Sequence, residues 1–172
     1  RYVALGLAWT VRVGGPKSPL RVQPGLKVSW YNFMFEEDVV IRKGPEAVTF
    51  DPLVVDGNEV GSLDKSKLVV PYVSVPLNVY LKFKSGFRIG GGGYVGYRIG
   101  GRSKVKYDLP GDRNNKDKER TNFYLNTWRY GASGLVGYKD MTLFCDYDLN
   151  TLFAEDRGPE LNAFAVGFRW LL

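Results

Sequence analysis

The sequence predicts an all-β fold, a single antiparallel up-and-down β-barrel of about eight strands, and three observations lead to this expectation. Bulky apolar side chains alternate with small or polar ones along many segments, as in strands whose two faces meet different surroundings. Aromatic residues make up 15% of the chain and glycine occurs 21 times, which suits short, tightly packed strands. No apolar run reaches the roughly 18 residues that a transmembrane helix needs.

The alternation is clearest in five segments. Every odd position is apolar or aromatic in 3–13, 69–83 and 141–149, as is every even position in 164–172, and the pattern recurs with glycines in 87–99. From these and weaker segments we expect strands near residues 2–13, 25–35, 47–56, 67–83, 86–100, 121–137, 139–149 and 161–172. The whole chain, 1–172, is then a single domain. Because Arg1 stands almost inside the first strand, we expect that an N-terminal leader, and further residues with it, has been removed.

Two features leave alternatives open. Residues 36–46 can extend either the second or the third strand, since Gly44-Pro45 is compatible with a turn or a bulge. Pro71 and Pro76 fall inside the fourth strand, although proline cannot donate to a strand ladder. A bulge, or a strand end outside the paired region, would accommodate both prolines.

The connections between strands alternate in length. Residues 84–86 and 138–140 read as tight turns, whereas longer loops are expected at 14–24, 57–66, 101–120 and 150–160. Short turns on one rim and long loops on the other are typical of outer-membrane barrels. The loop 101–120 holds many charged residues, so charge is kept away from the apolar faces.

The second face of the strands favours a membrane barrel over a soluble, lipocalin-like one. It consists mostly of Gly, Ala, Ser and Tyr with isolated Arg or Lys, which suits the narrow interior of an eight-stranded barrel rather than a water-facing surface. The bulky face then lies in lipid of a bacterial outer membrane. We expect these aromatic residues at the membrane interface: Trp9, Trp30, Tyr97, Trp128, Tyr130, Phe168 and Trp170.

If the bulky side chains point outward, the charged side chains on the second face point inward and form a charge network inside the barrel. Its expected members are Arg12, Lys82, Arg88, Arg98, Arg129, Asp146 and Arg169, with Lys27 as a further candidate and Asp148 near a rim. Buried charges are costly unless they are paired, so these residues should form a plug of salt bridges joined by tyrosines. A conducting pore is the alternative, and an anion site is a second one because the cations outnumber the acids.

Composition argues against several other functions. The chain has no histidine, which removes histidine bases, histidine metal ligands and the common nucleophile pairs, so we expect no enzyme, no cofactor and no metal. A single cysteine, Cys145, excludes an internal disulfide. The net charge of +6 is spread over interior positions and loops, which argues against nucleic-acid binding. Gly91–Gly96 matches a dinucleotide-binding glycine pattern, but a strand and not a helix is expected to follow.

Three stretches resemble a known family. Residues 67–78 read KLVVPYVSVPLN, residues 86–98 read GFRIGGGGYVGYR, and YDLNTLF at 147–153 is followed by GPELN at 158–162. Together they resemble the PorT-like outer-membrane β-barrel family of Bacteroidetes. The resemblance covers roughly residues 65–172; it implies an eight-stranded barrel and no activity, cofactor or catalytic residue. One departure is the chain end, Trp170-Leu171-Leu172, where such barrels usually end in Phe.

The sequence therefore predicts an integral outer-membrane β-barrel with a plugged lumen and a structural, interaction or secretion-accessory role. Its expected partners are outer-membrane lipid and, further, lipopolysaccharide or cell-envelope proteins. A small-solute pore and a soluble lipocalin-like carrier of an apolar ligand are the alternatives.

Overall fold

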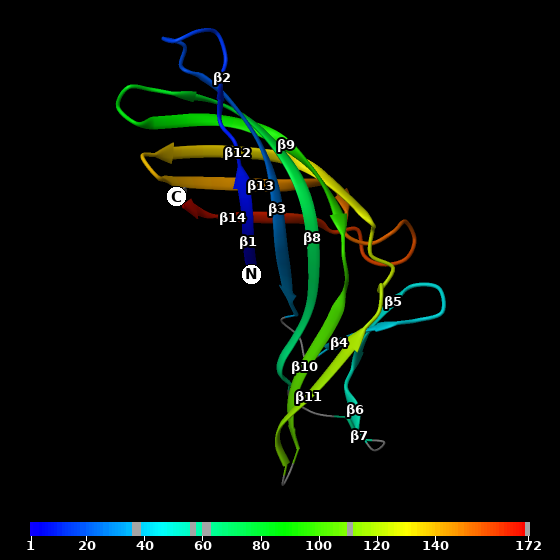
Figure 1. Cartoon of the computed structure of the whole chain (residues 1–172). Helices are drawn as coiled ribbons and strands as arrows, with labels where there is room; N and C mark the ends of the chain where they lie inside the picture. Colours follow the sequence, from blue (N-terminus) through cyan, green and yellow to red (C-terminus); the bar gives the residue numbers. More distant parts are fainter. Residues whose placement is uncertain (36–38, 56–57, 60–62, 110–111, 171–172) are drawn as a thin grey trace.

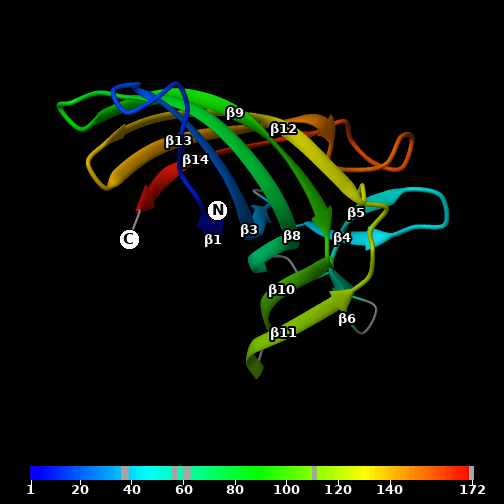
Figure 2. The ribbon, with the colours of Figure 1, turned by 45° about the horizontal axis from the view of Figure 1, so that its top comes forward.

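The computed structural model describes residues 1–35, 39–55, 58–59, 63–109 and 112–170, and the chain is all-β, as the sequence predicts. The main sheet follows the order β1-β3-β8-β9-β12-β13-β14, and each neighbouring pair is antiparallel. Its strands are β1 (Tyr2–Ala8), β3 (Leu20–Met34), β8 (Leu63–Lys82), β9 (Phe87–Arg98), β12 (Trp128–Tyr138), β13 (Met141–Thr151) and β14 (Asn162–Trp170). Figures 1 and 2 show this sheet curled into a half-barrel. We call its seven strands the wall.

Shorter strands extend or accompany the main sheet. They are β2 (Val11–Arg12), β4 (Val39–Lys43), β5 (Val48–Pro52), β6 (Val54–Val55), β7 (Asn58–Glu59), β10 (Arg102–Leu109) and β11 (Asp112–Arg120). β2 pairs with β3, whereas β4 with β5 and β6 with β7 form separate hairpins. Within the described ranges, no helix has the length and apolar character to cross a membrane.

The structure differs from the sequence-based prediction in several segments. β3 begins at Leu20 and β8 at Leu63, inside the loops expected at 14–24 and 57–66, and a hydrogen bond of 2.8 Å from Lys82 N to Pro19 O places the first of these connections at the rim of the tight turns. Residues 47–56, expected in the barrel wall, lie largely in the β4–β5 hairpin, whose turn is closed by a hydrogen bond of 3.0 Å from Gly44 N to Ala47 O. Residues 101–120, expected to be a loop, form the hairpin of β10 and β11, and β10 also pairs with β8. The strand expected over 121–137 begins only at Trp128, because Phe123 and Tyr124 have φ angles of 45° and 48° that no strand adopts.

The prolines inside β8 leave its register against β3 unchanged. β8 runs through Pro71 and Pro76, which lie opposite Trp30 of β3 and Tyr94 of β9. On the other side of β8, the ladder with β9 ends at Tyr72–Arg98 and the ladder with β10 begins at Val69–Arg102, so the partner segment has one additional residue beside Pro71, as the predicted bulge requires, whereas Pro76 lies within an unbroken ladder with β9. On the β3 side, Gly25 lies where a Cβ atom would approach Pro76 Cγ to 3.3 Å, so a residue without a side chain accommodates the proline ring.

The two faces of the curled sheet differ as the alternation predicts. Outward side chains of the wall are large, apolar and exposed, for example Leu77 at 51% and Phe168 at 75%. Inward side chains are polar or aromatic and buried, for example Tyr72 at 3% and Ser74 at 1%. This is the reverse of a lipocalin-like arrangement, in which the apolar side chains point inward.

An apolar cluster covers the end of the half-barrel where the long connections lie. Wall residues Tyr31, Leu68, Val70, Tyr72, Ala163 and Ala165 pack there with Ile41, Val48, Phe123, Leu125, Leu152 and Phe153 from the connections. We call this set the apolar cap. Tyr124 fixes it further, because its hydroxyl donates to the carbonyl oxygens of Gly44 (2.9 Å) and Pro45 (2.8 Å). The long connections therefore fold back onto the wall.

Glycines of β12 provide a test of interior packing. A Cβ atom on Gly131 would lie 2.2 Å from the carbonyl oxygen of Tyr147 and 2.4 Å from the Tyr94 hydroxyl, whereas one on Gly134 would meet nothing within 4 Å. We expect Gly131→Ala to lower the free energy of unfolding by about 1–3 kcal/mol through overpacking. Gly134→Ala, the matched control, should leave it nearly unchanged. Urea titration of both variants measures the difference, and equal effects would contradict the packing shown.

Candidate functional site

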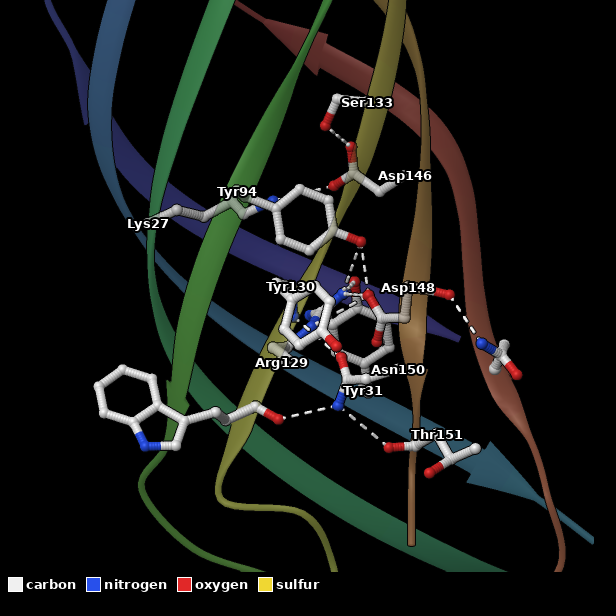
Figure 3. Close-up of polar contacts among 12 residues, drawn as sticks. Lys27, Tyr31, Tyr94, Arg129, Tyr130, Ser133, Asp146, Asp148, Asn150 and Thr151 are labelled. Carbon is white, nitrogen blue, oxygen red and sulfur yellow. Dashed lines mark hydrogen bonds and ion pairs between the residues drawn. The ribbon is translucent and has the colours of Figure 1, made fainter. Parts of the chain in front are cut away.

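The most connected polar group on the concave face is centred on Arg129 of β12, which is 3% exposed. Its Nη2 lies 2.5 Å and its Nε 3.2 Å from Asp148 Oδ1 on β13, so one carboxylate oxygen accepts both donors. The same Nη2 donates to the hydroxyls of Tyr31 (2.7 Å) and Tyr94 (3.3 Å). Figure 3 shows these side chains converging from β3, β9, β12 and β13.

Three tyrosine rings surround the Arg129 guanidinium. Its Cζ lies 4.2 Å from the ring centroid of Tyr31 and 4.9 Å from those of Tyr72 and Tyr94. Such contacts stabilise a desolvated cation through the negative face of the ring. Tyr94 also donates its hydroxyl proton to Asp148 Oδ1 at 2.5 Å. The ion pair is therefore enclosed, and its charges are balanced locally.

A second ion pair lies beside the first. Lys27 Nζ of β3 donates to Asp146 Oδ2 of β13 at 2.9 Å, and Ser133 Oγ of β12 donates to the other oxygen, Oδ1, at 2.6 Å. The Asp146 side chain is fully buried and that of Lys27 is 10% exposed. Lys27 Nζ also lies 5.3 Å from the Tyr94 ring centroid, which links the two pairs (Figure 3).

β3 is a neighbour of neither β12 nor β13 in the sheet order, so the contacts Tyr31–Arg129 and Lys27–Asp146 span the concave side. We call Lys27, Tyr31, Tyr94, Arg129, Ser133, Asp146 and Asp148 the polar cross-brace. Each of its charges has an opposite charge within hydrogen-bond distance, as buried ions require. This arrangement braces the wall and leaves neither a free base nor an activated nucleophile among its members.

Two of the seven predicted network residues, Arg129 and Asp146, belong to the polar cross-brace. Arg88 is buried but lies apart, donating to Lys139 O (2.5 Å) and Thr142 Oγ1 (3.1 Å). Arg98 donates to Asn126 O at 3.2 Å, and the Arg169 guanidinium lies 5.4 Å from the Phe144 ring.

Arg12 and Lys82 are exposed near the tight turns, and Arg12 donates to the carbonyl oxygen of Pro16. The structure thus separates these two residues from the polar cross-brace. Tyr31 was not predicted, although it shares the parity of Lys27 on the same strand, and that signal could have found it.

The predicted interface aromatics lie on the outward face. Six are exposed: Trp9 (59%), Tyr97 (47%), Trp128 (59%), Tyr130 (50%), Phe168 (75%) and Trp170 (67%). Trp30 is half-buried. Tyr97 and Trp128 lie opposite each other on β9 and β12, with ring centroids 5.1 Å apart in an edge-to-face contact.

A small cavity lies between inward side chains. A cavity of about 10 Å³, lined by Gln23, Tyr80, Arg88, Leu135, Thr142 and Arg169, holds about one water molecule. In the part of the chain that the structure describes, no group of three or more Cys, Asp or Glu side chains converges to bind a metal ion.

Comparison of the chain with protein-family models, curated proteins and solved structures found no match.

Proposed function

We propose that this chain is an integral β-barrel protein of a bacterial outer membrane, with a plugged lumen and a structural, interaction or secretion-accessory role. One observation carries the proposal: the wall exposes its bulky apolar side chains and buries its polar ones. In water such an outward surface is unfavourable, whereas in hydrocarbon it is the expected one. The resemblance of residues 65–172 to PorT-like barrels agrees with this proposal.

The dimensions of the wall support it. β12 and β13 have 11 residues each and β14 has 9, which matches the roughly 9–11 residues of a tilted transmembrane strand. Exposed aromatic residues lie near both ends of the wall. Trp9, Phe83, Phe87, Tyr138, Phe168 and Trp170 lie towards the tight turns, and Tyr97, Trp128, Tyr130 and Tyr147 towards the long connections. Two such bands are typical of the two interfaces of a membrane.

Antiparallel closure of the wall needs an odd number of further strands, and the proposed eight-stranded barrel has one. The main sheet has seven strands and each neighbour is antiparallel, so the edge strands β1 and β14 run in the same direction. A single strand antiparallel to both would complete eight strands and leave no free edge, which a lipid environment requires. The proposal therefore includes closure by one strand in addition to the seven of the main sheet.

The interior favours a plugged barrel over a pore. The polar cross-brace spans the concave side, and the apolar cap covers the end with the long connections. With the lumen filled, contacts made by the connections outside the membrane are the remaining route to function. That is the basis for a structural or interaction role.

Substitution of Leu77 tests the membrane assignment. Leu77 is 51% exposed on the outward face, midway along the wall portion of β8. We expect Leu77→Arg to lower the free energy of unfolding from lipid vesicles by about 2–4 kcal/mol, because a cation there enters hydrocarbon. Denaturant titration of the vesicle-folded protein measures the change.

Val54→Arg is the matched control, since Val54 is 47% exposed in β6, outside the main sheet. It should change stability by at most about 0.5 kcal/mol. If Leu77→Arg is tolerated equally well, the outward face meets water and the membrane proposal fails. Fractionation gives an independent test: a heat-modifiable band in the outer-membrane fraction is expected, and recovery in the soluble fraction would contradict the proposal.

A further inference from the structure

Beyond the wall, the far end of β8 forms a three-stranded extension with β10 and β11 (Figure 1). One side of this extension carries basic residues on all three strands. They are Lys65 and Lys67 on β8, Arg102, Lys104 and Lys106 on β10, and Lys118 and Arg120 on β11. We call this set the cationic face. All seven side chains are exposed or half-buried.

The strand register places like charges directly opposite one another. Lys104 pairs with both Lys67 and Lys118, Arg102 pairs with Arg120, and Lys106 pairs with Lys65. Directly opposed like charges destabilise a sheet. The pKa of Lys104 is lowered for this reason as well: partial burial lowers it most, and the neighbouring positive charges lower it further, namely Arg102, Lys67, Lys118 and Arg120.

The acids of the hairpin do not neutralise this face. Asp117 and Glu119 alternate with Lys118 and Arg120, so they point to the opposite side, where they line a cavity with Arg42 and Val40. Among the described residues, ion pairs within 4 Å occur only in the polar cross-brace. The seven cations therefore lack carboxylate partners in the described part of the chain, and an external anion would offset their repulsion.

The cationic face lies on the same side of β8 as the apolar outward surface, with the buried Val69 between them. Lys65 and Lys67 share the odd parity of Val73, Val75 and Leu77, so one side of β8 changes from apolar to basic along its length. On the neighbouring strand, Met34 lies opposite Lys67 and is 42% exposed. A partner with hydrocarbon and phosphate in one molecule matches both parts of this surface.

A nucleic acid fits the surface less well. Aromatic side chains that stack on bases are typical of single-strand binding. The described residues of the cationic face include none, since Tyr107 packs on the opposite side with Val105. Charge alone would attract either a nucleic acid or an anionic lipid, whereas the apolar surface on the same side favours a lipid.

We propose that the cationic face binds the phosphate groups of phosphorylated glycolipids in the outer leaflet beside the barrel. This inference rests on the proposed membrane function. The long connections lie at this end of the wall, and in outer-membrane barrels the long loops are extracellular. Each basic residue near an anionic lipid surface contributes about fivefold in affinity.

The test uses the folded full chain in neutral detergent, titrated with bisphosphorylated lipid A and followed by native mass spectrometry. We expect the variant Lys67→Gln/Lys104→Gln/Lys118→Gln to bind lipid A roughly a hundredfold more weakly than the unaltered protein. The matched control is Lys17→Gln/Lys84→Gln/Lys139→Gln, which removes the same charge from exposed lysines near the tight turns. It should bind as the unaltered protein does. Dephosphorylated lipid A should bind weakly to all three proteins.

Equal binding by the two triple variants would overturn the inference, and so would preferential binding of a single-stranded oligonucleotide. Insertion of each protein into neutral vesicles is measured separately. Failure of the unaltered chain to insert contradicts the proposed function itself. Insertion without phosphate-dependent lipid A binding contradicts only the role of the cationic face.

Discussion

Replacing Arg129 with methionine is expected to lower the free energy of unfolding by about 3–5 kcal/mol, the cost of leaving a buried charge without its partner. Asp148 is 5% exposed and accepts two hydrogen bonds from Arg129 on a single oxygen. Without them it keeps the Tyr94 hydroxyl, and the three tyrosine rings lose the cation that they surround. Urea titration of the folded protein, monitored by tryptophan fluorescence, measures the change.

Two further variants separate the ion pair from the loss of a positive charge. Lys82→Met removes a cation from an exposed position and should change stability by at most about 0.5 kcal/mol. Arg129→Met/Asp148→Leu removes both buried charges and should recover more than half of the loss, since apolar replacement of a whole buried pair is often neutral. A double variant as unstable as the single one would show that the ion pair is not the cause.

The direction of most wall side chains could be predicted from the sequence, because strand alternation is a local property of two successive residues, although Val69, expected on the exposed apolar side, is 3% exposed. Leu77 and Tyr72 face opposite ways in the structure as the pattern indicates. These features depend on parity alone and need no knowledge of which strands are neighbours.

Features that depend on pairing partners could not be predicted in this way. The alternation of 47–56 is compatible with any sheet, and the turn at Gly44 directs this segment into a hairpin with β4 instead of the wall. The charge density of 101–120 suggested a solvated loop, yet these residues pair in a hairpin and add to β8. Neighbouring strands override composition here, because backbone pairing is available at the end of β8.

The polar cross-brace shows the same limit. Parity places Arg88, Arg129 and Asp146 on the inner side, but depth along the wall decides which of them meet. The register of β12 against β13 puts Ser133 opposite Asp146, whereas Arg88 lies near Thr142 at the tight turns. Lys27 reaches Asp146 only because the sheet curls, which no single strand encodes.

Replacing Phe123 with alanine is expected to lower the free energy of unfolding by about 3–5 kcal/mol, which makes the apolar cap a main contributor to stability. Phe123 is 0% exposed and packs among side chains from the β4–β5 hairpin, the wall and the segment after β13. Its removal leaves a cavity that a rigid wall cannot fill.

Phe83→Ala is the matched control, because Phe83 is 44% exposed near a tight turn and its ring contacts that of Phe87. This variant should lower the free energy of unfolding by about 1 kcal/mol or less. Denaturant titration of both variants decides the point. Equal losses would mean that packing of the long connections on the wall does not stabilise the fold. The polar cross-brace alone would then fill the lumen.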